Sequence, residues 1–358
     1  MFQLGESRIE DSTSWRASEF ADRQPLYIEL GAPELSAIDR IMAGLRDEDV
    51  PFHDIRQAMF SDPDLNGTLA DLFATIMEGR GFAILRGIPV DRYGVADVER
   101  IFWGIGSHLG TGHSQSARGD YMGHVFDETK PGERQSARGY LSRRKLTLHT
   151  DLSEIVSLLC VRRAKSGGES VFVSAPAVYN TVLAEHPEFM PVYLRGFPYH
   201  RRGEEAPDAE PITPYDIPIF SAAHGTFSCF YVRGIFEVGL RDLKRDFTAL
   251  EIDALDYLDE VMNRDDICLR IQLEPGDAAF TNNRTVLHAR TEFEDWDEPE
   301  MKRLLLRLWL KSSASRPVIE NIDIYRNASG GLGIDYQPGQ EPATPAYSAY
   351  DDQPAPAA

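Results

Sequence analysis

The chain has 358 residues, of which 42 % are hydrophobic, and it carries a formal net charge of −20 at pH 7. This length can bury a sizeable core. The acidic balance argues against nucleic acid as a partner, because no basic field would collect phosphates. No apolar run reaches the ~18 residues that a membrane helix needs, so we expect no membrane span.

Three cysteines lie far apart in apolar runs, at Cys160, Cys229 and Cys268. An odd number at such spacing predicts no disulfide framework and indicates a reducing compartment. The first residues lack a basic stretch followed by an apolar block, so we expect no signal peptide. Together these features predict a cytoplasmic protein, and a homo-oligomer is compatible with them.

The first part of the chain reads as an arm followed by helices. Residues 1–35 are mixed and polar, and we expect a loosely attached N-terminal arm. Apolar residues at helical spacing predict helix within 35–80, ended by glycine at Gly79. Residues 82–90 predict a short apolar strand, and 97–110 a second amphipathic helix.

After residue 110, short apolar runs separated by Gly, Pro, Asp and Asn are typical of a β sandwich or barrel. Two helices interrupt these runs. Ser174 is a plausible N-cap for the first. Thr248 and Glu251 have the spacing of a capping box at the start of the second.

Residues 200–218 are polar and proline-rich, and we expect a long loop that acts as a lid rather than a regular element. The Pro/Ala-rich tail, 336–358, is expected to be disordered. We therefore expect a single domain over 36–335 between the arm and the tail.

The stretch "LTLHTDLSE" contains His149 and Asp151 at positions i and i+2. On a strand these side chains point to the same face, so an imidazole nitrogen and a carboxylate oxygen could reach one ion. A polar turn that contains a histidine is the alternative. The segment "TNNRTVLHAR" adds His288 at the end of a strand-like run. Two histidines and one carboxylate on a β fold can form the facial triad of non-haem iron(II) enzymes, with three positions left open.

The strand-like run "KRLLLRLWLK" places Arg303 and Arg307 four residues apart among apolar residues. A buried arginine is costly unless it is paired, and its planar fork suits a carboxylate. The two arginines are therefore either clamps for a carboxylate ligand or structural partners of Asp or Glu.

These segments, together with "SGGES" at 166–170, resemble the TauD/TfdA group of iron(II)- and 2-oxoglutarate-dependent dioxygenases, and most of all its clavaminate-synthase-like members. The resemblance covers about residues 65–335. It implies a mainly β fold with flanking helices, whose core is a double-stranded β-helix of the jelly-roll or cupin-like type. It also implies Fe(II) as cofactor, with 2-oxoglutarate and dioxygen as co-substrates.

The resemblance further implies roles for single residues. His149, Asp151 and His288 would be the catalytic iron ligands. Arg303, fifteen residues after His288, would pair with the distal carboxylate of 2-oxoglutarate. Ser170 lies where the family places a threonine that hydrogen-bonds the same carboxylate, and Arg307 looks like the second arginine that meets an anionic group of the substrate.

The expected reaction is hydroxylation of an unactivated C–H bond in a small, anionic or zwitterionic, amino-acid-like metabolite, with desaturation or cyclisation as variants. Asp151 argues against halogenation, because related halogenating enzymes lack this carboxylate. Gln115, Arg118 and Tyr121 are further candidates for substrate contacts. A metal-binding β-helix protein without activity and a cupin-like zinc hydrolase are the rival interpretations.

Overall fold

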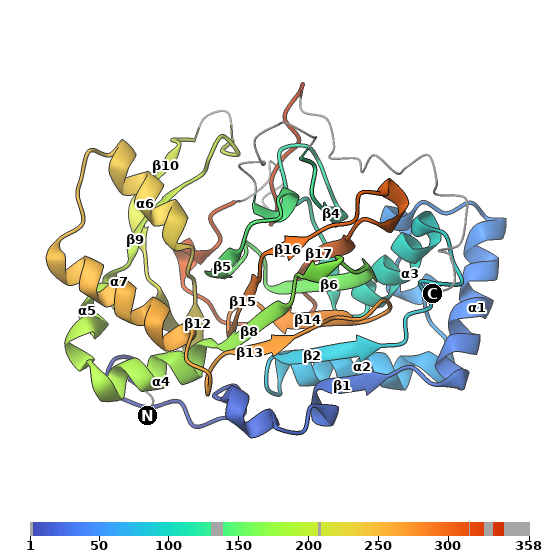
Figure 1. Cartoon of the computed structure of the whole chain (residues 1–358), viewed down its shortest axis with the longest axis horizontal. Helices are drawn as coiled ribbons and strands as arrows, with labels where there is room; N and C mark the ends of the chain where they lie inside the picture. The colour runs from blue at the N-terminus through green and yellow to red at the C-terminus, as the bar shows by residue number, and fades with distance from the viewer. Residues whose placement is uncertain (1–2, 130–138, 207–208, 315, 326–331, 340–358) are drawn as a thin grey trace.

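The computed structural model describes residues 3–129, 139–206, 209–314, 316–325 and 332–339, and two groups of helices flank its central strands (Figure 1). Among these residues, no helix is long and apolar enough to cross a membrane. The helices are α1 (Ala32–Asp47), α2 (Pro63–Met77), α3 (Val95–Ser107), α4 (Ala175–Glu185), α5 (Met190–Arg195), α6 (Arg233–Asp242) and α7 (Ala249–Met262).

The larger sheet has seven strands. In spatial order they are β1 (Tyr27–Glu29), β2 (Phe82–Arg86), β14 (Ala278–Asn282), β6 (Ile155–Arg162), β17 (Leu304–Ser312) and β3 (Gly110–Gly112), and β4 (Gly123–Val125) also pairs with β17. The pairing of β1 with β2 is parallel, and the other pairings are antiparallel.

The smaller sheet has four strands in the order β13 (Leu269–Ile271), β8 (Ser170–Ser174), β15 (Val286–Arg290) and β5 (Leu146–His149). Three two-stranded ribbons complete the β structure. They pair β9 (Phe197–His200) with β10 (Ile212–Ile217), β11 (Phe220–Ala223) with β12 (Thr226–Cys229), and β7 (Ser166–Gly167) with β16 (Phe293–Glu294).

Apolar side chains fill the space between the two sheets. Phe82 of β2 and Phe172 of β8 bring their ring centroids within 4.3 Å of each other. Leu305 of β17 and Val286 of β15 belong to the same buried cluster. Side chains alternate along a strand, so one face of each sheet supplies this shared core.

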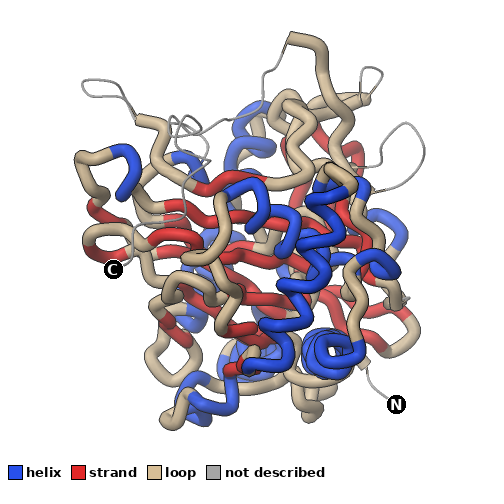
Figure 2. Tube along the Cα trace, turned by 90° about the vertical axis from the view of Figure 1, so that its right-hand side faces the viewer, coloured by secondary structure: helices blue, strands red, loops and turns tan. Residues whose placement is uncertain are grey.

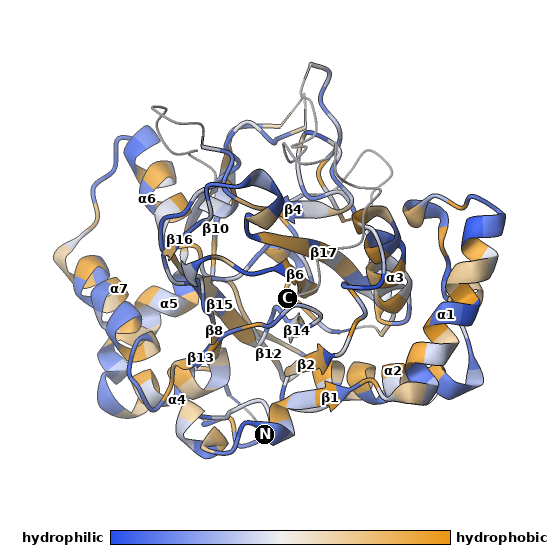
Figure 3. Cartoon of the chain, turned by 45° about the vertical axis from the view of Figure 1, so that its right-hand side comes forward, coloured by the Kyte–Doolittle hydropathy of each residue, from blue (hydrophilic) through white to orange (hydrophobic). Residues whose placement is uncertain are grey.

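The helices cover the outer faces of the two sheets. Leu306 and Leu308 of β17 join Leu72 and Phe102 of α2 and α3 in one buried cluster. The smaller sheet packs in the same way on α4 and α7, through a cluster that includes Val173. Figure 2, viewed from the side of α1, shows strands stacked behind helices, and Figure 3 shows the hydrophobic residues of β17 and β6 inside the body.

Two helix starts confirm the capping that the sequence predicts. The Ser174 hydroxyl accepts a hydrogen bond from the Ala177 N–H at 3.1 Å at the start of α4. At the start of α7, Thr248 and Glu251 form the reciprocal capping box. These contacts satisfy N–H groups that have no partner within the helix.

The expectation of a loosely attached N-terminal arm is wrong for much of residues 9–30. Strand β1 extends the larger sheet, and Trp15 and Leu26 are 3 % and 0 % exposed. Trp15 lies against Phe82, in the cluster between the sheets. Apolar residues are sparse in this segment, but each one fills a gap at the edge of the core, which polar composition alone does not reveal.

The expectation that 200–218 contains no regular element is also wrong, because β10 pairs with β9 as an antiparallel ribbon. The Thr213 hydroxyl accepts a hydrogen bond from the Tyr199 N–H at 2.9 Å and helps to hold this ribbon together. An edge ribbon tolerates proline, since an outward-facing position needs no N–H. Residues 207–208 of this segment and 340–358 of the tail lie outside the described residues.

Gly104 of α3 faces the buried Phe60 ring, which a Cβ at this position would overlap. We expect Gly104→Ala to lower the free energy of unfolding by roughly 1–3 kcal/mol through overpacking. Gly44 of α1 has open space around it, so Gly44→Ala should instead raise that free energy by up to about 1 kcal/mol. Denaturant unfolding of both variants tests this packing; equal effects would contradict it.

Candidate metal centre

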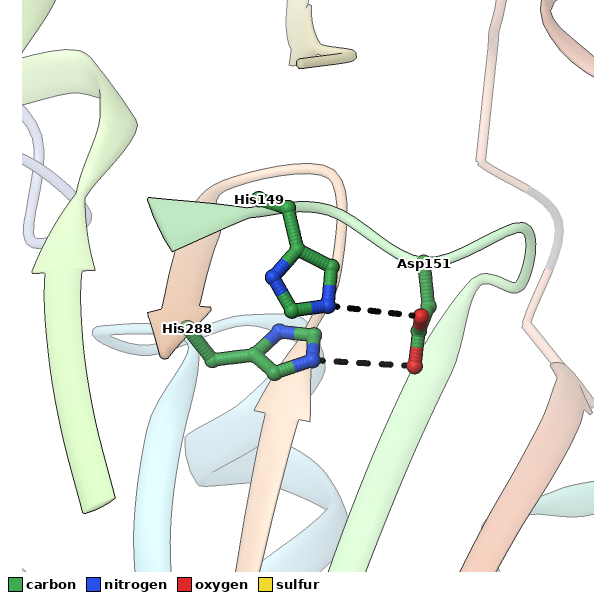
Figure 4. Close-up of side chains that lie close together, drawn as sticks. All are labelled: His149, Asp151 and His288. Carbon is green, nitrogen blue, oxygen red and sulfur yellow. Dashed lines mark ion pairs between the residues drawn. The ribbon is translucent and has the colours of Figure 1, made fainter. Parts of the chain in front are cut away.

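Three side chains from two neighbouring strands and the following turn converge at one end of the smaller sheet. His149 ends β5, Asp151 follows it by two residues, and His288 lies in β15 directly opposite His149. The His149 and His288 Nε2 atoms each lie 3.6 Å from an oxygen of Asp151 (Figure 4). One ligand atom from each residue lies within 4.8 Å of the other two, and no other such group of His, Cys, Asp or Glu occurs among the described residues.

Asn283 fixes the backbone around Asp151. Its side-chain oxygen accepts from the Asp151 N–H at 2.9 Å, and its amide donates to the Asp151 and Ser153 carbonyls, each at 2.7 Å. Asn283 is fully buried in the turn between β14 and β15. The turn that leads into the His288 strand therefore also places the carboxylate.

Hydrogen bonds outside the cluster set the orientation of two ligands. The Nδ1 atom of His149 lies 2.8 Å from the Thr147 carbonyl, which leaves Nε2 facing Asp151. The Trp309 indole N–H donates to Asp151 Oδ2 at 2.9 Å. Burial would raise the pKa of Asp151, but Arg307 and the two histidines outweigh burial and hold that pKa well below its usual range.

Arg307 lies beside the cluster and is held on several sides. Its Nη1 atom is 3.5 Å from Asp151 Oδ2, and its Nε donates to the Gln115 side-chain oxygen at 2.8 Å. The rings of Tyr140 and Trp309 lie 4.9 and 4.8 Å from its guanidinium carbon. A guanidinium fixed in this way offers its remaining N–H groups to an anion with little loss of rotamer entropy.

A cavity of about 210 Å³ opens over these groups. It is lined by Gln115, by residues 139–140, by the turn that follows β5, by side chains between 199 and 235, and by β17. Its walls are formed by Gln115, Gly139, Tyr140, His149, Thr150, Asp151, Leu152, Tyr199, Arg202, Glu204, Val232, Ile235, Arg307 and Trp309. Of the predicted substrate contacts, Gln115 is therefore in the wall.

Arg118 and Tyr121 do not line this cavity, which corrects their expected place. Tyr121 is 46 % exposed, packs against Trp103 and borders two other surface hollows. The chain turns tightly after Gln115, where the Gln115 N–H donates to the Asp120 carbonyl. This turn carries the residues that follow away from the metal centre.

Arg303 lies inside the body, immediately before β17, and is 3 % exposed. Its guanidinium carbon is 4.9 Å from the centre of the Phe293 ring, and its Nη1 is buried with no hydrogen-bond partner among the described residues. Burial lowers the pKa of Arg303 to about 10. Ser170, at the start of β8, is also buried. A buried guanidinium with an unused N–H is suited to a carboxylate ligand.

The residues present fit a divalent metal and a dicarboxylate co-substrate. Two imidazole nitrogens and one carboxylate oxygen can cover one face of an octahedral ion, which leaves the cavity side open. The buried Nη1 of Arg303, which has no hydrogen-bond partner among the described residues, would suit a second negative group. The sequence patterns did not indicate Asn283 or Trp309 as site residues. Trp309 lies two residues after Arg307 on β17, so strand alternation places both on the same face and could have indicated Trp309.

Comparisons with known proteins agree with this geometry. The family model "Taurine catabolism dioxygenase TauD, TfdA family" matches residues 48–309. FR-33289 synthase of Streptomyces rubellomurinus is 32 % identical over 262 residues, covering 72 % of this chain and 77 % of that protein. Taurine hydroxylase-like protein SAT17 of Stachybotrys chartarum is 26 % identical over 313 residues, covering 84 % and 79 %.

Solved structures with the same fold include an asparagine oxygenase in complex with Fe(II), 3-hydroxyasparagine and succinate, at a TM-score of 0.61 and 18 % identity, covering 86 % of this chain and 99 % of that one. The non-haem iron oxygenase OrfP with Fe and alpha-ketoglutaric acid has a TM-score of 0.60 at 16 % identity, covering 80 % and 94 %. These likenesses confirm the double-stranded β-helix core with flanking helices. The chain belongs to the TauD/TfdA family of iron- and 2-oxoglutarate-dependent dioxygenases.

Proposed function

We propose that this enzyme hydroxylates an unactivated C–H bond of a small, anionic or zwitterionic, amino-acid-like metabolite, with His149, Asp151 and His288 as the iron ligands. The observation that carries the proposal is the convergence of these three side chains beside a cavity that also contains Arg307. When bound, iron and 2-oxoglutarate supply the oxidising power: dioxygen gives one atom to the substrate and one to succinate, and carbon dioxide is released.

In this proposal different side chains bind the co-substrate and the substrate. Arg303 and Ser170 bind the distal carboxylate of 2-oxoglutarate, and Arg307 binds an anionic group of the substrate. The cavity wall then holds the target carbon near the ligands and excludes water, through apolar contacts from Val232 and Ile235. Support for an amino-acid-like substrate also comes from the similar asparagine oxygenase and from OrfP, which was crystallised with L-Arg.

We expect His149→Ala to abolish iron-dependent release of succinate from 2-oxoglutarate, with a loss of at least roughly 100-fold, because removing a ligand costs more than disturbing its outer partners. His53→Ala is the matched control, since His53 is exposed and remote from the cluster. Succinate release by His149→Ala at the unaltered rate would contradict the proposed iron site.

Trp309→Phe should weaken iron binding by roughly 10- to 100-fold while preserving the fold, because it removes the N–H bond to Asp151 but keeps an aromatic ring. Competition with a metal chelator under anaerobic conditions measures the affinity, and thermal unfolding checks the fold. An unchanged iron affinity would show that the indole N–H does not hold the metal-binding carboxylate.

Arg307→Met should remove the preference for an amino acid over its carboxamide, with kcat/KM for the acid falling roughly 10- to 100-fold. The amino acid is chosen from a panel by consumption of 2-oxoglutarate. Lys311→Met is the matched control, because Lys311 lies on the same strand but pairs with Glu154 away from the cavity. A preference kept in Arg307→Met would contradict the role of this arginine.

A further inference from the structure

Arg290 is a second buried arginine near Arg303. It ends β15, two residues after His288, so both side chains belong to one face of the strand. It is 5 % exposed, and in the sheet it lies directly opposite Ser170 of β8. Arg290 is therefore placed on the ligand side of the smaller sheet, displaced from His288 towards Ser170.

Arg290 and Arg303 pack against the same aromatic ring. Their guanidinium carbons lie 4.8 and 4.9 Å from the centre of Phe293. Neither arginine forms an ion pair with a described residue, and the buried Nη1 of each, with Nε of Arg290, has no hydrogen-bond partner there. Asp127 and Asp295 act on these arginines only from beyond ion-pair distance. Two buried cations that share one ring and have no ion-pair partner are unfavourable unless a ligand supplies the negative charge.

The remaining guanidinium nitrogen of Arg290, Nη2, hydrogen-bonds the backbone. Its Nη2 donates to the Ser142 and Arg144 carbonyls at 2.7 and 2.6 Å. These bonds tie residues 139–144 to the end of β15, and the Phe293 N–H strengthens the tie by donating to the Arg143 carbonyl at 3.1 Å. Nη2 thus anchors backbone, whereas Nε and Nη1 stay available to a ligand.

We infer that Arg290 is a second guanidinium for the distal carboxylate of 2-oxoglutarate, which it binds together with Arg303 while it anchors residues 139–144. This inference rests on the proposed function and adds a residue that the sequence motifs do not assign. The unused N–H groups of both arginines and the shared Phe293 ring carry it.

The arrangement links the co-substrate to the substrate cavity. The anchored segment carries Tyr140, whose ring lies against Arg307 and lines the cavity. A carboxylate that holds Arg290 in place also holds the carbonyls that fix this segment. Arg290 is therefore a positioning residue for the substrate side as well as a contact for the co-substrate.

Comparing the binding of 2-oxoglutarate and 2-oxopentanoate shows whether Arg290 contacts the distal carboxylate or has a purely structural role. 2-Oxopentanoate has the chain of 2-oxoglutarate with a methyl group in place of the distal carboxylate. Isothermal titration calorimetry measures the Kd of each acid for protein loaded with redox-inert Zn²⁺. The preference for 2-oxoglutarate is the Kd of 2-oxopentanoate divided by the Kd of 2-oxoglutarate. We expect Arg290→Gln to lower this ratio roughly 10- to 100-fold, with the Kd of 2-oxopentanoate unchanged.

Arg284→Gln is the matched control, because Arg284 is similarly buried in the turn before β15 but pairs with Asp323. It should leave the preference intact. If Arg290→Gln does not fold, Arg290→Lys, which keeps the charge, carries the test, and its preference should fall several-fold. A preference that stays at the unaltered value, or both Kd values rising together, overturns the inference. An unaltered protein that shows no preference for 2-oxoglutarate would instead contradict the proposed function.

Discussion

The antiparallel pairing of β15 with β5 is the interaction on which the metal centre depends. It places His288 opposite His149, and the pairing of β15 with β8 on its other side fixes the same register. Leu287, the next residue along β15, packs into the helix-covered cluster. A slip of one residue would therefore bury the imidazole among apolar side chains and turn Leu287 towards the cavity. Asn283, in the turn before β15, hydrogen-bonds the backbone of Asp151. The register of β15 against β5 therefore positions all three side chains.

Positively charged side chains lie inside the body, although the whole chain is negatively charged. The chain carries a net charge of −20, yet Arg290 and Arg303 are buried against one aromatic ring, and Arg307 lies beside Asp151. Arg307 has Asp151 beside it, whereas Arg290 and Arg303 form no ion pair with a described residue; Asp127 and Asp295 act on them only from a greater distance. Burial lowers the pKa of Arg290 to about 9 and that of Arg303 to about 10. The folded chain thus keeps costly buried cations where the proposed reaction needs to bind anions.

The sequence could predict features that depend on local patterns. The cap at Ser174, the capping box at Thr248 and the strand-rich core with flanking helices are confirmed, because each follows from short-range spacing. The order of the sheets and the neighbours of each ligand depend on long-range pairing, so no local signal identified Asn283 or Trp309 as partners of Asp151. Tyr121 was wrongly expected at the cavity for a different reason, because a tight turn after residue 115 redirects the chain.

We propose above that His149, Asp151 and His288 hold one iron ion. The most direct test is anomalous scattering at the iron absorption edge, from crystals grown without oxygen in the presence of Fe(II) and 2-oxoglutarate. We expect one strong peak at bonding distance from the Nε2 atom of each histidine and from an Asp151 oxygen. A fully loaded crystal with its iron peak elsewhere, or with a peak that touches only one of the three side chains, would contradict the account.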